Sequence, residues 1–196
     1  LSGCGATQTP IGAPGAMPQS RPIAARGHND YDVTRPLLYV TDFIAWTVTV
    51  YHASAKDPAP IATVSQDLDA PAGDCIDSHG TLYVTNEPIS GPGWVSEYPL
   101  GVSKPLRIIT KGIDTPAYCA IDSNSNLWAT NIGGANVTEY LYGSKRPHMV
   151  ITNGVPHPVG IAIDRSGNLY VARGRTEFRV NELSPSRKRG TEIGAA

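Results

Sequence analysis

Short apolar runs bounded by polar turn residues recur along this chain and predict a repeated set of β-strands. The run LYVTN at Leu82–Asn86 returns as LWATN at Leu127–Asn131 and as LYVAR at Leu169–Arg173. Such runs, rich in Val, Tyr and Thr and flanked by Gly, Pro, Asp, Asn or Ser, are typical of strands. The aromatic residues that the repeat aligns lie 44, 45 and 42 residues apart, at Tyr39, Tyr83, Trp128 and Tyr170.

Two further phrases and a proline–aspartate pair repeat at the same period. One phrase is VTVY, VSEY, VTEY or VNEL, at 48–51, 95–98, 137–140 and 180–183; the other is IATV, RIIT or MVIT, at 61–64, 107–110 and 149–152. Pro71, Pro116 and Pro158 each stand six residues before an aspartate, namely Asp77, Asp122 and Asp164. The segments that follow suit tight hairpin turns, because Asp bonds its own downstream backbone and Gly or Asn accepts a positive φ. The second repeat therefore has four predicted strands, at about 72–77, 81–86, 94–99 and 106–110.

Four antiparallel strands in every repeat of about 40–45 residues predict an all-β fold, a β-propeller of four-stranded blades. Leucine-rich repeats are shorter, and helical repeats need a 3.6-residue periodicity that this chain lacks. An immunoglobulin-like sandwich would not repeat its own phrases. We expect about three complete blades plus partial ones within 37–196, at 37–65, 71–110, 116–152 and 158–194.

The runs LYVTN at 82–86 and PVGIAIDRSGNLYVA at 158–172 resemble the NHL and YVTN types of β-propeller repeat. The resemblance covers about residues 37–196. It implies that the first strand of each blade lines a central channel and that the fourth strand lies outermost. Because such blades serve very different proteins, the resemblance is specific for the fold and says little about function.

The number of blades does not decide whether the propeller closes. The first repeat begins at its second strand, LLYVTD at 37–42, with no clear strand before it, and the last ends near TEIG at 191–194. An open arc exposes edge strands and apolar blade faces. We favour a truncated product of a longer gene. The alternatives are a small four-bladed ring with RPIAARG at 21–27 as the missing strand, or self-association through the open blade edges.

The N-terminal segment 1–36 resembles the end of a bacterial lipoprotein signal followed by a tether. LSGC at 1–4 places Leu and two small residues before a cysteine, so Cys4 is the predicted site of lipidation. The following residues are rich in Ala, Gly, Pro and Ser and cannot form a packed face. The alternative is a chance cysteine in a Gly- and Ala-rich terminus. A lipid anchor would place the protein in the bacterial cell envelope, in the periplasm or at the outer membrane; otherwise it is secreted.

Composition excludes some classes of partner. The chain has 196 residues and a net charge of -1, so it lacks the basic excess of a general nucleic-acid binder. Since it contains no run of 18 apolar residues, membrane contact is expected only through the N-terminal lipid anchor.

Cys75 and Cys119 are a candidate disulfide. Both fall in the first strand of consecutive blades, but Cys75 lies four residues after the repeat proline and Cys119 three. Because side chains alternate along a strand, the two thiols leave opposite faces of their sheets. They either meet between the blades or point away from each other. The alternative is a pair of small buried thiols.

Most other polar residues are interpreted as structural. Asp77, Asp122 and Asp164 recur once per blade at a turn, and Glu97, Glu139 and Glu182 recur once per blade at a blade face or edge. The basic run SRKRG at 186–190 is expected in a solvated turn. The tryptophans Trp46, Trp94 and Trp128 are expected to pack between blades. The histidines are expected in the tether, turns or links, at 28, 52, 79, 148 and 157.

We therefore predict a non-enzymatic, envelope-anchored NHL-type propeller that binds a protein or a small molecule at its channel mouth or loops. No catalytic residue can be assigned, and no cofactor or metal is expected, because the chain has neither a CxxC pair nor two histidines at ligand spacing. The alternative is a lyase or lactonase similar to streptogramin lyase or gluconolactonase, with its metal site in blades that this sequence does not contain. The metal ligands of those enzymes cannot be matched here residue by residue.

Overall fold

The computed structural model describes residues 29–54, 56–174, 179–183 and 191–193, which form four antiparallel β-sheets. The first sheet has three strands and the other three have four each. The strands are β1 (Leu37–Asp42), β2 (Thr47–His52) and β3 (Ala62–Val64); β4 (Pro71–Ile76), β5 (Leu82–Asn86), β6 (Trp94–Tyr98) and β7 (Arg107–Ile109); β8 (Pro116–Ile121), β9 (Leu127–Asn131), β10 (Asn136–Tyr140) and β11 (Met149–Ile151); β12 (Pro158–Ile163), β13 (Leu169–Arg173), β14 (Arg179–Leu183) and β15 (Thr191–Ile193).

The sheets are the predicted blades, each a meander in which consecutive strands pair. The strands of the second blade lie within one residue of their expected bounds. Among the residues that the structure describes, the first blade has no strand before β1, as the sequence indicates, so β1 is an edge strand of its described sheet. No helix in the part of the chain that the structure describes is long and apolar enough to cross a bilayer.

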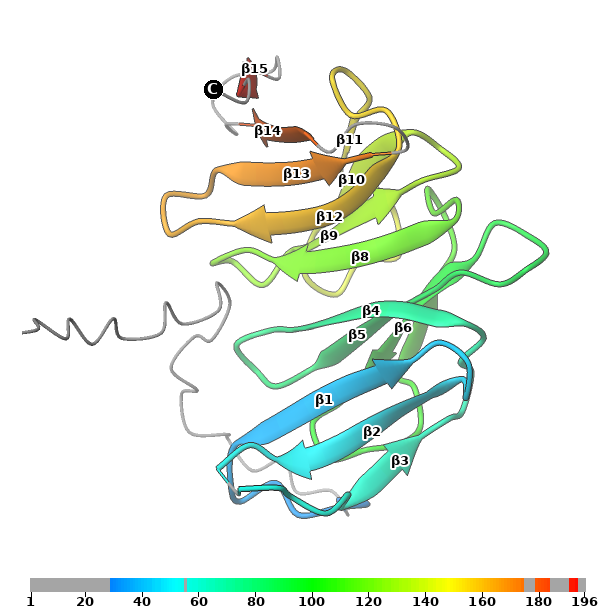
Figure 1. The fold of residues 1–196 in the computed structure, drawn as a ribbon, viewed down its shortest axis with the longest axis vertical. Helices are drawn as coiled ribbons and strands as arrows, with labels where there is room; N and C mark the ends of the chain where they lie inside the picture. The colour runs from blue at the N-terminus through cyan, green and yellow to red at the C-terminus, as the bar shows by residue number, and fades with distance from the viewer. Residues whose placement is uncertain (1–28, 55, 175–178, 184–190, 194–196) are drawn as a thin grey trace, which may run out of the picture.

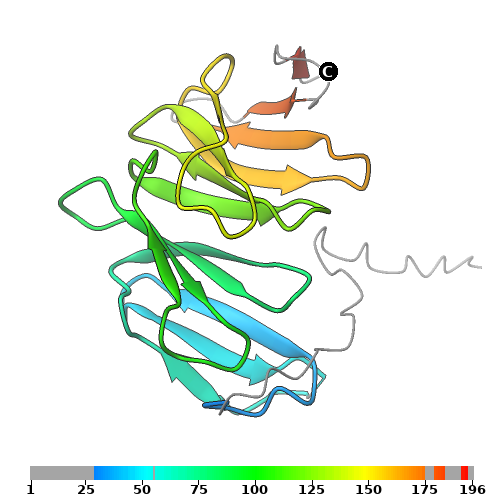
Figure 2. The same cartoon turned by 180° about the vertical axis from the view of Figure 1, so that it is seen from behind.

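The blades are arranged around their innermost strands as in a propeller. Strand β4 lies against β8, and β8 lies against β12, whereas the fourth strands lie outermost in their sheets. Figure 1 shows the first and last blades at opposite ends of the molecule, and the view from behind in Figure 2 shows the same order. The fold class predicted from the sequence is therefore confirmed, and the described blades form an open arc.

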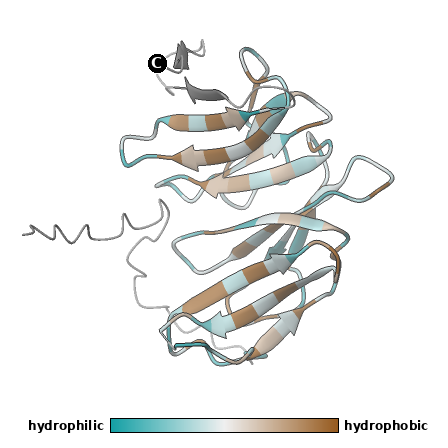
Figure 3. Cartoon of the chain, viewed as in Figure 1, coloured by the Kyte–Doolittle hydropathy of each residue, from teal (hydrophilic) through white to brown (hydrophobic). Residues whose placement is uncertain are grey.

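The hydrophobic core lies in three seams between neighbouring blades. Alternate residues of each strand face one seam or the other, and Figure 3 shows the resulting apolar bands across the strands. In the first seam, Val48 and Val50 of β2 pack with Leu82 and Val84 of β5, and all four are buried. In the second seam, Tyr83 packs with residues of the third blade, and in the third seam Trp128 packs with residues of the fourth.

Gly73 shows how closely the inner strands approach. A Cβ atom at this position would lie 2.9 Å from the carbonyl oxygen of Ala117 and 2.8 Å from a ring atom of Tyr118. The hydroxyl of Thr85 donates to the carbonyl oxygens of Gly73 and Ala117, at 3.1 and 2.8 Å. The second and third blades are therefore joined by a polar contact as well as by their apolar seam.

Candidate functional site

Cys75 and Cys119 meet across the second seam. The structure joins their sulfurs at 2.06 Å, with the Cα atoms 5.7 Å apart and a sequence separation of 44 residues. Of the two arrangements that the alternation of side chains allowed, the blades adopt the one in which the thiols face each other. The bond lies among apolar side chains of the second core cluster.

The three repeated aspartates organise the turns between the first and second strands of their blades. Asp77 Oδ1 accepts from the backbone N–H groups of His79 and Thr81, at 2.8 and 2.9 Å. Asp122 and Asp164 accept the same pair of hydrogen bonds in the next two blades. Hydrogen bonding to Asn168 holds the pKa of Asp164 below its usual value. These carboxylates serve turns, as the repeat predicted.

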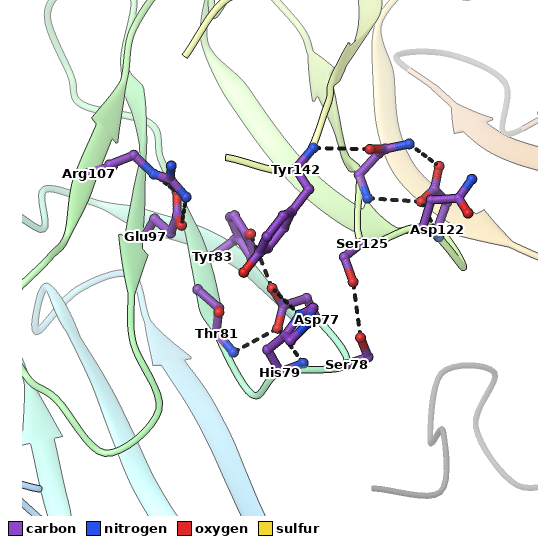
Figure 4. Close-up of polar contacts among 12 residues, drawn as sticks. Asp77, Ser78, His79, Thr81, Tyr83, Glu97, Arg107, Asp122, Ser125 and Tyr142 are labelled. Carbon is purple, nitrogen blue, oxygen red and sulfur yellow. Dashed lines mark hydrogen bonds and ion pairs between the residues drawn. The ribbon is translucent and has the colours of Figure 1, made fainter. Parts of the chain in front are cut away.

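A polar cluster lies where these turns meet at the second seam, shown in Figure 4. The fully buried carboxylate of Asp77 accepts from the hydroxyl of Tyr83 at 3.3 Å and lies 3.7 Å from His79 Nδ1. The half-exposed ring of His79 stacks on Tyr142 of the third blade, with ring centroids 5.1 Å apart. Ser78 and Ser125 also share a hydrogen bond, of 3.0 Å, across the seam.

Glu97 and Arg107 form the charged part of this cluster. The carboxylate of Glu97 accepts two hydrogen bonds from the Arg107 guanidinium, which also donates to the carbonyl oxygen of Gly143 at 2.7 Å. Hydrogen bonding of the Arg107 guanidinium to Glu97 raises the pKa of Arg107. The buried Glu139 holds the same place in the third blade, and burial raises the pKa of its carboxyl. Both glutamates lie on a blade face, as expected.

The crevice beside this cluster is small. It has no internal space large enough for a water molecule and is lined by Tyr83, Glu97 and the 140–144 segment among others. Ligand pockets for drug-sized molecules measure about 300–1,000 Å³. Among the residues that the structure describes, no group of three or more His, Cys, Asp or Glu could hold a metal ion. The Ser78–Ser125 hydrogen bond and the stacked rings of His79 and Tyr142 join the second and third blades at this cluster.

Some residues singled out in the sequence lie outside the described ranges, and the histidines differ in their positions. Cys4, His28 and the SRKRG run at 186–190 lie outside the described residues. The expectation for the histidines is wrong for His52, which is the last residue of β2, is buried, and has its Nε2 atom 3.4 Å from Asp32 Oδ2. His148 is exposed, and His157 precedes β12 with a φ of 49°.

The tryptophans differ in their surroundings. Trp128 is buried in the third seam, as predicted. The half-buried Trp94 donates from Nε1 to the carbonyl oxygen of Asp67, in the link between the first and second blades, at 3.1 Å. Trp46 does not pack between blades, because 49% of it is exposed in the turn between β1 and β2. The packing interpretation is therefore wrong for Trp46.

We call the exposed side chains of this turn the apolar tip, which consists of Phe43, Ile44 and Trp46. Their exposed fractions are 47%, 85% and 49%. The turn is well defined, because Asp42 Oδ1 accepts from the backbone N–H groups of Ile44 and Ala45, both at 2.9 Å. Trp46 has a φ of 57°, in the left-handed region that costs a side-chain-bearing residue about 1 kcal/mol or more.

The corresponding turn of the third blade shows that the fold does not require these side chains. Both turns place four residues between paired strand ends, at 43–46 in the first blade and at 132–135 in the third. The third blade has the sequence IGGA there, and Ala135 has a φ of 47° in the position of Trp46. The same turn is therefore built with two glycines and an alanine. Ile44 and Trp46 contribute apolar surface that the blade does not need.

Ile89 adds to the apolar surface at this end of the molecule. It lies between β5 and β6 and is 97% exposed. Figure 1 shows the β1–β2 and β5–β6 turns on the same side of the arc, opposite the β4–β5 and β8–β9 turns. Comparing the turn sequences of the first and third blades would have indicated the apolar tip, because Ile44 stands where the third blade has Gly133 and Trp46 where it has Ala135.

Comparison with known proteins supports the fold alone. No family model matches the chain, and no curated protein sequence matches it. Hydrazine synthase of Kuenenia stuttgartiensis is similar in structure with a TM-score of 0.68 and 17% identity, over 80% of this chain and 45% of that chain. A nidogen/laminin complex is similar with a TM-score of 0.67 and 17% identity, over 80% of this chain and 58% of that chain. This chain thus spans about half the length of those propeller-containing chains.

Proposed function

We propose that this chain is a non-enzymatic binding module of the NHL or YVTN type, which holds a protein partner through the apolar tip and Ile89. The observation that carries the proposal is the exposure of Ile44 and Trp46 in a turn that the third blade builds with Gly133 and Ala135 at the same places. Exposed apolar side chains on a rigid turn favour binding, because their burial on a partner releases water without ordering a loop.

The residue types of the tip also fit a protein interface. Tryptophan is enriched among the residues that dominate binding energy, and binding loops on rigid scaffolds are a common arrangement. Trp46 is held at a positive φ by its turn, so the side chain is presented in a defined direction at a cost in backbone energy.

Anchoring in the bacterial envelope is the second part of the proposal. The chain has three cysteines, and the structure joins two of them, which leaves Cys4 for a lipid. A disulfide also suits an oxidising compartment such as the periplasm. The Gly- and Pro-rich segment after Cys4 would let the blades reach a partner at a distance from the membrane.

A photo-crosslinking amino acid in place of Ile44 tests the binding surface in the native cells. The matched control places the same crosslinker at Lys104, an exposed residue of the turn before β7, at the opposite end of the blades. We expect one discrete crosslinked protein from position 44, absent from position 104 and lost when Trp46→Ala is added. The same products from both positions, or none from position 44, would overturn the binding surface.

The anchor is tested separately by the mass of the mature N-terminus and by cell fractionation. We expect a lipid-modified Cys4 in the membrane fraction, and release of the Cys4→Ser variant into the soluble fraction. An unmodified Cys4 would refute the anchor without affecting the binding surface, because the crosslinking test does not depend on it.

A further inference from the structure

The outer face of the first blade is exposed at positions that the other blades bury. Leu38 is 48% exposed, whereas Leu82, Leu127 and Leu169, which hold the same place in β5, β9 and β13, are 1%, 2% and 1% exposed. Two positions along, Val40 is also largely exposed, whereas its counterparts Val84, Ala129 and Val171 are completely buried. We call the face formed by Leu38, Val40 and Tyr51 the head face. Tyr51 pairs with Leu38 and so shares its side of the sheet.

The three internal seams show what covers a face of this kind. In each seam, such a face is covered by the preceding blade. That blade contributes an aromatic residue from its second strand, a valine from its third and a valine or isoleucine from its fourth. These sets are Tyr39, Val48 and Val64; Tyr83, Val95 and Ile109; Trp128, Val137 and Ile151. The valine pairs with the fourth-strand residue in all three blades.

The last blade carries the same set in the same register. Tyr170 stands in β13 at the place of Tyr83, and the strands pair Val180 with Ile193. We call the side of this blade defined by Tyr170 and Ala172 the tail face. Tyr170 is half-buried, whereas its counterparts Tyr39, Tyr83 and Trp128 are buried in their seams. The head face of the first blade and the tail face of the last blade are therefore complementary, because they carry the two sets of residues that meet in each internal seam.

We infer that a second copy of this chain covers the head face with its tail face. The contact repeats the internal seam, with the Leu38–Val40 side of one copy packed on the Tyr170 side of the next. It is heterologous, because each copy contributes a different surface, and an open assembly of any length keeps one free head face at one end and one free tail face at the other. This assembly does not depend on the apolar tip, which lies in the turn beyond β1.

The first experiment measures mass against concentration by sedimentation and light scattering, on the full chain without its lipid. We expect species above the mass of one chain that become more populated as concentration rises. Leu38→Asp and Ala172→Asp should each weaken association by at least about tenfold, because each buries a charge in one half of the seam. Tyr170→Asp is a second tail variant, and circular dichroism establishes that each variant folds.

Ile89→Asp is the matched control, since it places the same charge on an apolar residue of a different surface. It should leave association unchanged. A variant of the tip, Trp46→Ala, should likewise leave association unchanged while removing the crosslink described above. Loss of partner binding and loss of self-association are thus separate results.

Mixing the two monomeric variants gives the decisive result. The Leu38→Asp copy keeps its tail face and the Ala172→Asp copy keeps its head face, so the mixture should form a one-to-one dimer that grows no further. A wild-type chain that stays a monomer at every concentration would overturn the proposal. It would also be overturned if Ala172→Asp and Tyr170→Asp left association intact, because the contact would then join two head faces.

Discussion

Cys75 of β4 and Cys119 of β8 join consecutive blades through their innermost strands, with Cα atoms 5.7 Å apart. This separation is typical of disulfides. The bond closes a loop that contains the outer strands of the second blade, so it restricts the unfolded chain over one whole repeat. Its place beside the propeller axis also holds two inner strands together where an open arc has fewer neighbours than a closed ring.

Removal of this disulfide is expected to destabilise the blades under oxidising conditions. Cys75→Ser or Cys119→Ser should lower the free energy of unfolding by about 3–4 kcal/mol, as the closure of a loop of this length predicts. Denaturant titration measures this difference in the free energy of unfolding between the wild-type protein and each variant. Reducing the disulfide of the wild-type protein should remove most of that difference.

Cys4→Ser is the control, because Cys4 takes no part in the bond. Without reductant, alkylation followed by mass spectrometry should label only one of the three cysteines in protein without a lipid. Labelling of all three before reduction would show that the bond does not form in solution.

Asp74 gives the protein a pH dependence in the mildly acidic range, because burial raises the pKa of its carboxyl. It holds the place of Cys119 and Ile161 on the side of its blade that faces the first blade, and it adds to the rise in the pKa of Tyr39, which is mainly due to burial. Burial raises the pKa of Asp74 from 3.8 to about 6. Between these values the folded state binds more protons than the unfolded state, so stability falls as pH rises.

Asp74→Asn should therefore stabilise the protein above pH 6, on the order of 2 kcal/mol, and have little effect below pH 4. Unfolding curves of both proteins across this range measure the difference. Carbon NMR of the Asp74 carboxyl measures its pKa directly. Parallel stability curves for the two proteins would contradict the expectation.

Asp77 and Asp164 offer a comparison between two equivalent turns in different surroundings. Asp77→Ala should lower the free energy of unfolding by about 2–3 kcal/mol, because it removes the acceptor of two backbone N–H groups from a carboxylate site that water does not reach. Asp77→Asn retains an acceptor oxygen and should cost less.

Asp164→Ala is the matched control for Asp77→Ala. Its carboxylate accepts the same two backbone hydrogen bonds in a turn with more access to solvent, where water can replace it. Denaturant unfolding should give a smaller loss than for Asp77→Ala. Equal losses would indicate that burial of the turn does not govern the contribution of the aspartate.

The sequence predicted the strands and the blade order well, because each blade must present the same small set of residues to its neighbours. Leu82 and Leu127 are buried by the same kind of contact, so their phrases stay similar. The sequence only partly predicted the pairing of Cys75 with Cys119. Alternation along a strand places the thiols on opposite faces, but the order of blades around the axis decides whether those faces meet.

The candidate binding surface was less accessible to sequence reasoning. Trp46 stands beside a strand phrase and Trp128 within one, and hydrophobicity alone assigns both to the core. Their exposure differs because the turn at 43–46 projects beyond the sheets, whereas Trp128 lies within β9. The informative signal was a difference between copies, namely the FIAW turn of the first blade against the IGGA turn of the third.

The cost of the apolar tip to the fold is itself measurable. Trp46→Gly should leave stability unchanged or raise it by up to about 1 kcal/mol, because glycine adopts the φ of 57° without strain and the exposed ring contributes little burial. Ala135→Gly, at a φ of 47° in the third blade, is the matched control and should have a similar effect on stability. Only Trp46→Gly should abolish the crosslink from position 44. A clear loss of stability for Trp46→Gly alone would show that the tryptophan supports the first blade, and the tip would then be part of the fold rather than a surface for a partner.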